Sequence, residues 1–443
     1  MNVRGDLWFL VHIPRLPECL AVAKPHLVAE MHPLSRSSST RSAEGKQTCA
    51  NAWNQLRYGS LHIDKAFPPC QQSWNKPVKI AANVPCAPEP RKGMPATKLS
   101  NEEFTQRYME QFFDPAFDSL RSELDKISNV AWENYNQSRK SPITEKAGIG
   151  FANADYDLSV EWHATSGAIA QAQKQYEDGS LPPRILLVNG SSRSDHSCPG
   201  EMSKSFRMVE IARDVLETEF SISVDVLDLS KLSSEYGRQI HPCKACFSTA
   251  APLCHWPCSC YPNHAMGQAQ DWMAEIYPLW VAAHGVMIVT PVNWYQVSSP
   301  VKLMMDRLVC ADGGNPDPTL TDGKDAALAK KLELGGWDYP RHLAGRAFSV
   351  IVHGDVAGVE NVRRSLSDWL KFMKLVPAGG NSEVDRYIGY WEPYATNHLA
   401  LDQDQAMQDE VRNAARSIGA AVVQRHGGGC PEPGANLSEP RQK

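Results

Sequence analysis

The spacing of apolar and polar residues divides the chain into three parts. Residues 1–97 show no sustained periodicity of either a helix or a strand. Residues 98–180 carry apolar residues at helical spacing, beginning after Ser100, which forms a capping-box sequence with Glu103. They predict an N-terminal helical extension that serves as a packing layer or a dimer surface. In residues 181–425, short apolar runs alternate with longer amphipathic segments.

The third part predicts an α/β domain. Its apolar runs have the length of buried parallel strands, and helical patterns separate them. Strands are expected at 185–189, 224–229, 285–290, 347–352 and near 375–378, and helices at 201–220, 265–282, 300–308, 359–372 and 402–424. This alternation predicts a doubly wound, five-stranded parallel sheet with helices on both faces. In such a sheet, a ligand binds beyond the carboxyl ends of the strands.

The two ends of the chain differ in composition from the part between them. Residues 1–97 contain 12 Lys or Arg and 6 Asp or Glu, a net charge of +6, whereas the whole chain carries −5. They also hold 11 of the 31 prolines. Such a segment buries too little apolar surface to offset the entropy of the chain. We expect a disordered extension, an N-terminus set too early with translation beginning at Met94, or an organellar presequence. Residues 426–443, rich in Gly and Pro, predict a flexible tail.

Length and charge exclude several classes of protein. The chain has 443 residues, of which 42% are apolar and 21% charged, a globular balance. A net charge of −5 offers no basic excess for nucleic acid. The longest apolar run, 277–289, is too short for a membrane span of about 20 residues. Twelve cysteines, five of them crowded into 243–260, differ from a secreted disulfide scaffold and favour a reducing compartment, so we expect a cytoplasmic protein.

The first predicted strand ends in a loop rich in hydroxyl groups. The loop reads Asn189-Gly-Ser-Ser-Arg-Ser194 and reaches the next helix at Ser203-Lys-Ser205. Gly190 permits a tight turn, and the hydroxyls and N–H groups at a helix N-terminus suit a phosphate, whose charge Arg193 can neutralise. The alternative is a serine-rich helix cap without a ligand, because neither G-x-x-x-x-G-K-[ST] nor G-x-G-x-x-G is present.

Two further strand ends carry polar and aromatic residues. The third strand runs into Thr290-Pro-Val-Asn-Trp-Tyr-Gln-Val297, whose aromatic and amide groups suit a planar heteroaromatic ring. Trp294 and Tyr295 could instead be core or interface aromatics. The fourth strand ends in His353-Gly-Asp355, which could meet the edge of such a ring or its sugar-like chain. Alternatively, Asp355 only caps the following helix.

Together, the three loops resemble those of the flavodoxin-like, NADPH-dependent FMN reductase family. Gly190-Ser-Ser-Arg193 is similar to that family's G-S-x-R phosphate loop, and Thr290-Pro-Val through Pro300-Val-Lys302 to its flavin loop. The resemblance implies a flavodoxin-like fold with strand order 2-1-3-4-5 that binds FMN. The implied cofactor-binding residues are Ser191, Arg193, Ser203, Lys204, Ser205, Pro291, Val292, Asn293, Trp294, Tyr295, Gln296, Val297, His353, Gly354 and Asp355.

The same resemblance implies an activity. We expect an FMN-dependent oxidoreductase that takes a hydride from NAD(P)H and passes electrons to a small-molecule acceptor, as a homodimer or tetramer. The flavin would carry the chemistry, so no catalytic side chain is assigned. The alternative is an electron-transfer flavoprotein in which a cysteine-bound iron–sulfur cluster serves a protein partner. A metal- or redox-sensing protein that has lost FMN is a third possibility.

The cysteine-rich segment after the second strand bears on that choice. Its cysteines are Cys243, Cys246, Cys254, Cys258 and Cys260. They partly resemble the compact cluster motif of iron–sulfur flavoproteins, with Thr249 where the third cysteine would stand. Four thiolates can hold an iron–sulfur cluster or zinc, whereas structural or dithiol cysteines need no metal. No metal ligand is assigned from the sequence, and the segment is expected near the flavin end of the strands.

Overall fold

A computed structural model of the protein describes residues 99–197, 203–389, 392, 396 and 398–429. All of them belong to one unit of the chain, Ile80–Lys443. The predictions made for residues 1–97 lie outside the described residues, as does the predicted tail from residue 430 onward. The domain boundaries expected at residues 97, 180 and 425 therefore stay predictions.

Strands and helices alternate along the chain in the order that the sequence predicted, and several short strands and 3-10 helices occur in addition. The strands are β1 (Thr144–Lys146), β2 (Asp157–Ser159), β3 (Arg184–Asn189), β4 (Ser223–Asp228), β5 (Gly285–Asn293), β6 (Gln296–Val297), β7 (Ala347–Gly354), β8 (Val376–Pro377) and β9 (Glu383–Tyr387). The α-helices are α1 (Asn101–Met109), α2 (Arg121–Asn136), α3 (Val160–Glu177), α4 (Lys204–Glu219), α5 (Lys231–Ser234), α6 (Met273–Ala282), α7 (Ser299–Asp312), α8 (Ala326–Leu334), α9 (Val359–Phe372), α10 (His398–Gln403) and α11 (Gln405–His426). Short 3-10 helices are η1 (Glu110–Phe112), η2 (Pro115–Leu120), η3 (Cys246–Ser248), η4 (Ala251–Leu253), η5 (His264–Met266) and η6 (Pro318–Thr321).

The main sheet has the predicted topology. Its parallel strands lie in the order β4-β3-β5-β7, and β8 and β9 both pair with the outer side of β7. Numbered along the chain from β3, this is the order 2-1-3-4-5 of a flavodoxin-like fold. The edges of the sheet are β4 on one side and β8 and β9 on the other.

The predicted five-stranded parallel order is confirmed, and two further strands, β6 and β9, bring the sheet to seven. β6 adds an antiparallel pair to the end of β5. The fifth position is shared by two strands: β8 is a two-residue piece of the run predicted near 375–378, and β9 pairs further along β7. Strand β9 contains a single buried apolar residue, Val384, so its sequence carries no apolar run that could have revealed it.

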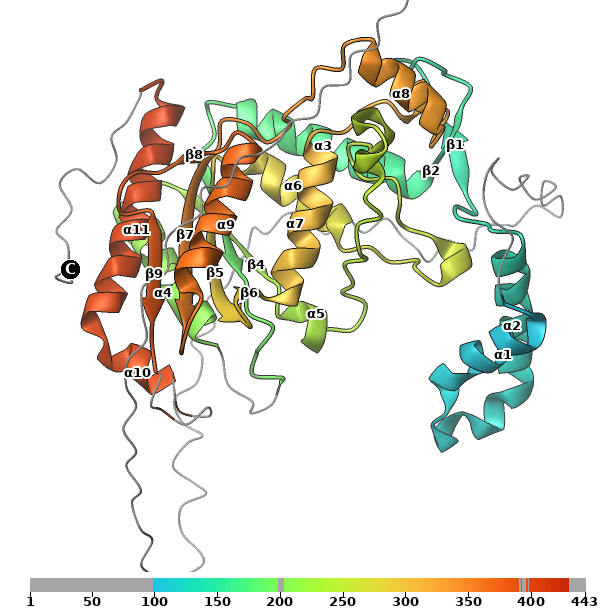
Figure 1. Ribbon diagram of the computed structural model, residues 1–443, viewed down its shortest axis with the longest axis horizontal. Helices are drawn as coiled ribbons and strands as arrows, with labels where there is room; N and C mark the ends of the chain where they lie inside the picture. Colours follow the sequence, from blue (N-terminus) through green and yellow to red (C-terminus); the bar gives the residue numbers. More distant parts are fainter. Residues whose placement is uncertain (1–98, 198–202, 390–391, 393–395, 397, 430–443) are drawn as a thin grey trace, which may run out of the picture. The chain divides into compact units, whose positions relative to one another are not determined.

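Successive side chains of the central strands point alternately into two separate hydrophobic cores. Helices must therefore cover both faces of the sheet. Leu186 and Val188 of β3 face a core shared with α3, α6, α7 and α9. Ile185 and Leu187 face the opposite core, shared with α4 and α11. Figure 1 shows these two groups of helices on the two sides of the strands.

The segment before the main sheet is mostly helical, as predicted. Ser100 and Glu103 form the expected capping box on α1. Asp114 accepts a hydrogen bond from the Ala116 N–H group, but the turn that it caps is the 3-10 helix η2, and α2 begins only at Arg121. Helix α3 packs on α6. The antiparallel pair β1–β2 was not foreseen.

One predicted helix is shorter in the structure. The sequence pattern predicted a helix over 265–282, whereas α6 begins at Met273. Gly267 adopts a left-handed conformation, with φ +68°, and ends the short helix η5. The chain therefore turns before α6, because a left-handed residue stops a right-handed helix.

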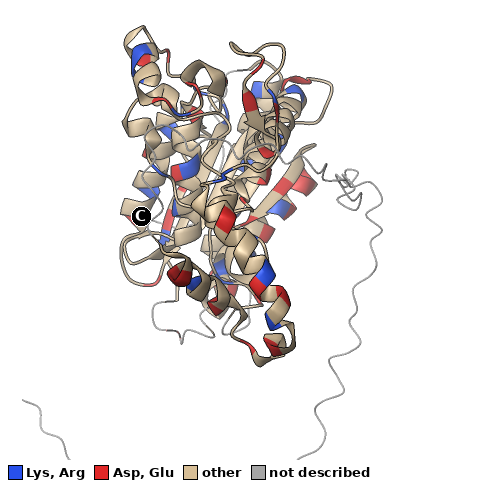
Figure 2. Cartoon of the chain, turned by 90° about the vertical axis from the view of Figure 1, so that its right-hand side faces the viewer, with Lys and Arg blue, Asp and Glu red and all other residues tan. Residues whose placement is uncertain are grey.

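The hydropathy of the helices and the distribution of charge are two further features of the described residues. Within the described part of the chain, none of the helices combines the length and apolar character needed to cross a membrane. Basic and acidic side chains are interspersed along the elements visible in Figure 2.

Candidate functional site

The three predicted strand-end segments meet at the carboxyl end of the main sheet. The first segment follows β3 and leads to α4, the second is the end of β5 together with β6, and the third follows β7. Asn189 at the end of β3 pairs in register with Val289 of β5, and Thr290 of β5 with Val352 of β7. The segments that leave these strands are therefore neighbours in space. Contacts between each pair of them, described below, assemble one site.

Gly190 joins the first segment to the second. Its N–H group donates to the Val289 carbonyl at 2.7 Å, and the Ser298 hydroxyl donates to the Gly190 carbonyl. A Cβ atom at this position would lie 2.7 Å from both Thr290 and Val301 side-chain atoms. The sequence argument gave Gly190 the role of permitting a turn, but the structure gives a different reason: only glycine leaves room for the neighbouring strand and helix.

The first segment is held in place by its own hydroxyl and amide groups. The Ser191 hydroxyl accepts from the Arg193 N–H group at 3.1 Å, and Asn189 Oδ1 accepts from the Ser191 N–H group at 3.2 Å. Asn189 also donates to Asp228 Oδ1 at 2.7 Å. Sequence reasoning did not assign Asn189 a role, although it directly precedes the predicted loop.

The N-terminus of α4 lies in this site. Ser203 is its N-cap and accepts from the Phe206 N–H group at 3.2 Å. Ser203, Lys204 and Ser205 are all buried. Free N–H groups and a buried positive charge at a helix N-terminus are the features that hold a phosphate group.

Lys204 ties the first segment to the third. Its side chain is only 7% exposed, and its Nζ atom donates to Asp355 Oδ1 and to the Ile388 carbonyl, both at 2.8 Å. The carbonyl of Ile388 was not predicted as part of the site. The Asp355 side chain is about half exposed, so solvent screens its negative charge more than the positive charge of the buried Lys204 ammonium group at the start of α4.

Ser205 and His353 form a second link between these segments. The distance between Ser205 Oγ and His353 Nε2 is 2.7 Å, and both side chains are buried. Burial, followed by the nearby charge of Lys204, lowers the pKa of His353 to about 3, so the imidazole is neutral at physiological pH. Its Nδ1 atom has no hydrogen-bond partner among the described residues. A buried polar atom without a partner is uncommon and indicates a ligand or water at that position.

The second segment is a hairpin with an unusual turn. Trp294 and Tyr295 connect the paired residues Asn293 and Gln296, and both have positive φ, +49° and +66°. A two-residue turn with two left-handed residues usually contains Asn-Gly, because other side chains are strained there. Trp294 is 94% exposed and Tyr295 60% exposed, so the alternative that they are core aromatics is wrong.

The remaining predicted residues lie around this hairpin. Pro291 and Val292 are half-buried, Asn293 and Gln296 are exposed, and Val297 is buried. The third segment closes against it: a Cβ atom on Gly358 would lie 3.1 Å from Tyr295 Cα. Gly354 is buried and Asp355 exposed beside it. The structure therefore brings all the predicted cofactor residues to one end of the sheet.

The cysteine-rich segment lies elsewhere, which corrects the expectation that it borders the flavin end. Cys243 contacts Cys310, near the C-terminus of α7. Cys310 is about 16 Å along that helix from Ser299, which follows the hairpin. All cysteines of the described residues are free thiols. Over those residues, no group of three or more His, Cys, Asp or Glu side chains is arranged to hold a metal ion.

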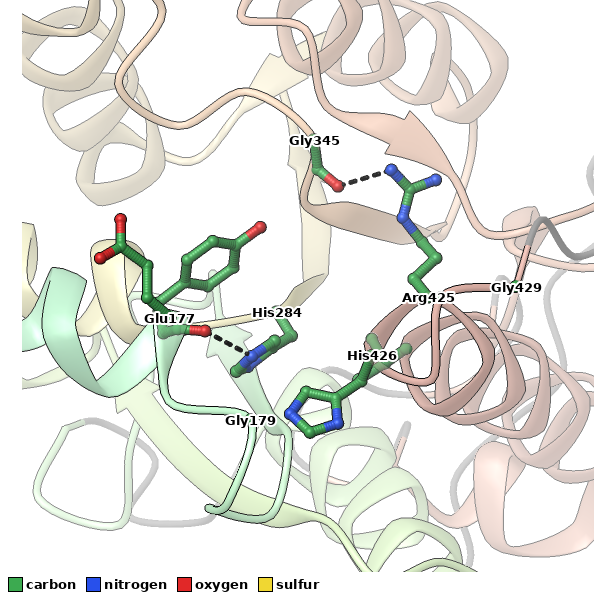
Figure 3. A pocket seen from close by; sticks show the side chains of 10 residues that line it. Glu177, Gly179, His284, Gly345, Arg425, His426 and Gly429 are labelled. Atoms are coloured by element: carbon green, nitrogen blue, oxygen red, sulfur yellow. Dashed lines mark hydrogen bonds between the residues drawn. The ribbon is translucent and has the colours of Figure 1, made fainter.

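A cavity of about 510 Å³ lies at the opposite, amino-terminal end of the strands (Figure 3). Its lining includes His284, Arg425 and His426 and none of the predicted cofactor residues. His284 Nε2 donates to the Tyr176 carbonyl and its Nδ1 accepts from the Arg184 N–H group, both at 3.1 Å. Burial, with His426 nearby, lowers the pKa of His284 to about 4. Ligands of such sheets bind at the carboxyl ends of the strands, which is the opposite end of the sheet from this cavity.

Comparison with protein families agrees with the geometry. The family described as NADPH-dependent FMN reductase matches residues 183–386, from the start of β3 to the end of β9. The resemblance drawn from the three loops is thereby confirmed for residues 183–386, which match a family of FMN-dependent oxidoreductases. No curated protein matches the sequence.

Several solved structures are similar to about half of this chain. RosB with a bound 8-demethyl-8-formylriboflavin-5'-phosphate intermediate is 13% identical, with a TM-score of 0.39 over 54% of this chain and 79% of its own. The apo form of an NADH:FMN oxidoreductase, EMOB, is 12% identical, with a TM-score of 0.31 over 54% and 89%. An azoreductase from Bacillus anthracis str. Sterne is 10% identical, with a TM-score of 0.30 over 54% and 99%.

Proposed function

We propose that this chain binds FMN at the carboxyl end of its main sheet, takes a hydride from NAD(P)H and passes electrons to a small-molecule acceptor. The observation that carries the proposal is the unpartnered Nδ1 atom of buried His353, beside the capped N-terminus of α4 and the buried charge of Lys204. These features fit a phosphate-bearing ligand, and the family of residues 183–386 supports FMN as that ligand.

The phosphate group would lie on the first segment. Ser191, Arg193 and Ser203 would hold it together with the N–H groups at the start of α4. His353 would donate from Nδ1–H to the phosphate, while its Nε2 atom accepts a hydrogen bond from the Ser205 hydroxyl. Lys204 stays paired with Asp355, so it would contribute its charge through space and not as a direct ligand.

The ring system would lie against the hairpin. Pro291, Val292 and Val297 offer apolar surface, Asn293 and Gln296 offer amides, and the exposed rings of Trp294 and Tyr295 offer flat walls. Gly354 and Asp355 would border its other edge. FMN supplies the hydride and electron chemistry, and the residues of this chain bind it, orient it and exclude water.

We further propose a cytoplasmic homodimer or tetramer. The free thiols of the described cysteines support a reducing compartment. Trp294, almost fully exposed at the candidate site, supports an assembly in which a second subunit covers that edge.

Purified protein provides the first test. Flavin released by denaturation should run as FMN in chromatography, and oxidation of NADH or NADPH should require it. Release of FAD, or failure of deflavinated protein to take up FMN, would contradict the proposal.

Arg193→Ala tests the phosphate position. A charge-assisted hydrogen bond contributes roughly 1.5–3 kcal/mol, so the variant should bind FMN about 10- to 150-fold more weakly in a fluorescence titration. Arg364→Ala, at an exposed arginine of α9, is the matched control and should bind FMN like the unchanged protein. Equal affinity of the two variants would remove Arg193 from the site.

A further inference from the structure

The cavity at the amino-terminal ends of the strands is built mostly by parts of the chain outside residues 183–386 (Figure 3). Of the described residues that line it, only His284, directly before β5, and Gly345, shortly before β7, lie within that segment. The others come from the end of α3 and the residues after it, and from the last turn of α11 and the glycines that follow. The volume, about 510 Å³, is that of a pocket for a small organic ligand.

Three rings that touch one another line the cavity. The centroid of the His284 ring lies 4.7 Å from that of Tyr176 and 5.2 Å from that of His426. Both nitrogens of His284 are bonded to the backbone, at the Tyr176 carbonyl and the Arg184 N–H group. The imidazole is therefore fixed, and burial, which lowers its pKa to about 4, keeps it neutral. Together the rings offer planar, uncharged surface to an aromatic ligand.

Two side chains of the last turn of α11 bring donor groups to the same cavity. Arg425 is half-buried, and its Nη2 atom donates to the Gly345 carbonyl at 2.9 Å. Among the described residues, its guanidinium group has no carboxylate partner. His426 Nε2 is buried and likewise lacks a hydrogen-bond partner there. In Figure 3, the His426 ring points toward His284 and the Arg425 side chain toward Gly345. Both groups can donate to an acceptor that a ligand supplies.

The negative groups around the cavity limit the charge of that ligand. The carboxylate of Glu177 accepts from the Gln173 side-chain amide at 2.8 Å, and in Figure 3 it points away from Arg425. Helices α3 and α11 both end here, and the partial negative charge of their C-termini disfavours a dianion. The buried guanidinium of Arg346, 4.3 Å from the centroid of the Tyr176 ring, offsets part of that charge. One free guanidinium group therefore matches a ligand with a single negative charge.

We propose that this cavity binds an aromatic carboxylate, which is a planar ring system that bears one carboxyl group. The carboxylate accepts from the N–H groups of Arg425 that Gly345 does not use, because its planar oxygens match the planar guanidinium group. The Nε2–H group of His426 donates to the second carboxylate oxygen. The ring system lies along Tyr176 and His284.

The length of β5 separates this cavity from the candidate flavin site. The strand has nine residues, and at about 3.3 Å per residue it spans about 30 Å. A small ligand bound beside His284 therefore cannot touch a flavin at the other end of the strand. The cavity is a binding site of its own, and the proposal stands independently of FMN binding.

Titration of the full chain with 2-naphthoate, measured by isothermal titration calorimetry, tests the proposal. We expect saturable binding of one molecule per chain, both with and without added FMN. Naphthalene-2-carboxamide has the same shape without the charge, and decahydro-2-naphthoate has the charge without the aromatic rings. Each should bind at least tenfold more weakly than 2-naphthoate.

Hydrogen–deuterium exchange of the unchanged chain locates the ligand. Added 2-naphthoate should slow the exchange of backbone amides in residues 176–179 and 422–429, and leave residues 293–297 of the hairpin unchanged. Arg425→Gln should weaken the binding of 2-naphthoate at least tenfold, because the guanidinium group is lost. Arg364→Gln, at an exposed arginine of α9 outside the cavity, is the matched control and should bind like the unchanged chain. Melting temperatures verify the fold of both variants.

Several results would overturn the proposal. Absence of saturable binding, or equal affinity for 2-naphthoate and either of its two analogues, would reject the aromatic carboxylate. Tighter binding of 2-naphthyl phosphate would show that the site prefers a dianion. Equal affinity of the two arginine variants, or protection confined to residues 293–297, would place the ligand elsewhere. The ligand series and the exchange measurement use the unchanged chain, so they decide even if Arg425→Gln does not fold.

Discussion

His353 shows how a single residue can report on the environment of the candidate site. Its ring is buried, neutral and hydrogen bonded to Ser205, and it lies close enough to Lys204 for the ammonium charge to oppose protonation. The sequence placed this histidine at a strand end and suggested contact with the edge of a ring. The contact that it makes, with a serine 148 residues earlier in the chain, could not be derived from local sequence.

This burial predicts a pH dependence of stability. The folded-state pKa of His353, about 3, lies below the ordinary value of about 6.5, so the unfolded chain binds more protons between these values. Stability is therefore lost as pH falls below about 6.5. Between pH 6.5 and 5, the unchanged protein should lose about 1.5 kcal/mol more of its free energy of unfolding than His353→Gln does. Urea unfolding at several pH values measures the difference.

A matched control separates this effect from general acid sensitivity. His196 has a side chain that is 76% exposed, and His196→Gln should keep the pH dependence of the unchanged protein. Equal slopes for His353→Gln and His196→Gln would show that His353 is not the buried neutral group described.

At the scale of elements, the β5–β6 hairpin combines strain with exposure. Two consecutive left-handed residues without glycine each cost of order 1–3 kcal/mol unless the surroundings compensate, and large side chains at this turn gain little from burial. Stability alone would favour Asn-Gly at these positions. Trp294 and Tyr295 therefore indicate a function, and we propose that they form a wall of the flavin pocket.

The double substitution Trp294→Asn and Tyr295→Gly should change stability and binding in opposite directions. We expect the free energy of unfolding of the flavin-free protein to rise by about 1 kcal/mol, because turn strain is relieved. The FMN dissociation constant should rise at least tenfold, because the aromatic wall is lost. Tyr236→Ser, at a fully exposed tyrosine outside the site, should alter neither quantity. A double variant that is destabilised and still binds FMN normally would refute the assignment.

The elements that the sequence predicted well are those with strong local signals. Strands β3, β5 and β7 are nearly continuous apolar runs, since both of their faces are buried. β9 was missed because its residues are mostly polar, and the shorter α6 because Gly267 stops the helical pattern only through its left-handed conformation. The residues of the candidate site were predicted because they lie in polar or aromatic loops that follow the predicted strands. The pairing of Lys204 with Asp355 depends on contacts between distant parts of the chain and needed the structure.

At the scale of the whole molecule, FMN binding should stabilise the folded state. A ligand that binds only the folded state stabilises it by about 2.7 kcal/mol at a free concentration 100 times its dissociation constant. FMN added to deflavinated protein should therefore raise the melting temperature with increasing concentration. Riboflavin at the same concentration should raise it less, because it lacks the phosphate for the α4 N-terminus. Equal stabilisation by both flavins would argue against the phosphate site.

The order of the strands also bears on how copies of the chain can associate without aggregating. One edge of the main sheet is β4, which carries Asp225 and Asp228, and the other includes β9, with Glu383, Asp385 and Arg386. Short edge strands with charged side chains resist pairing with the edges of other molecules. Fibril-like growth by edge-to-edge addition is thus disfavoured at both ends of the sheet. A homodimer or tetramer of this protein would accordingly form through its helices and loops, and not by continuing the sheet from one subunit into the next.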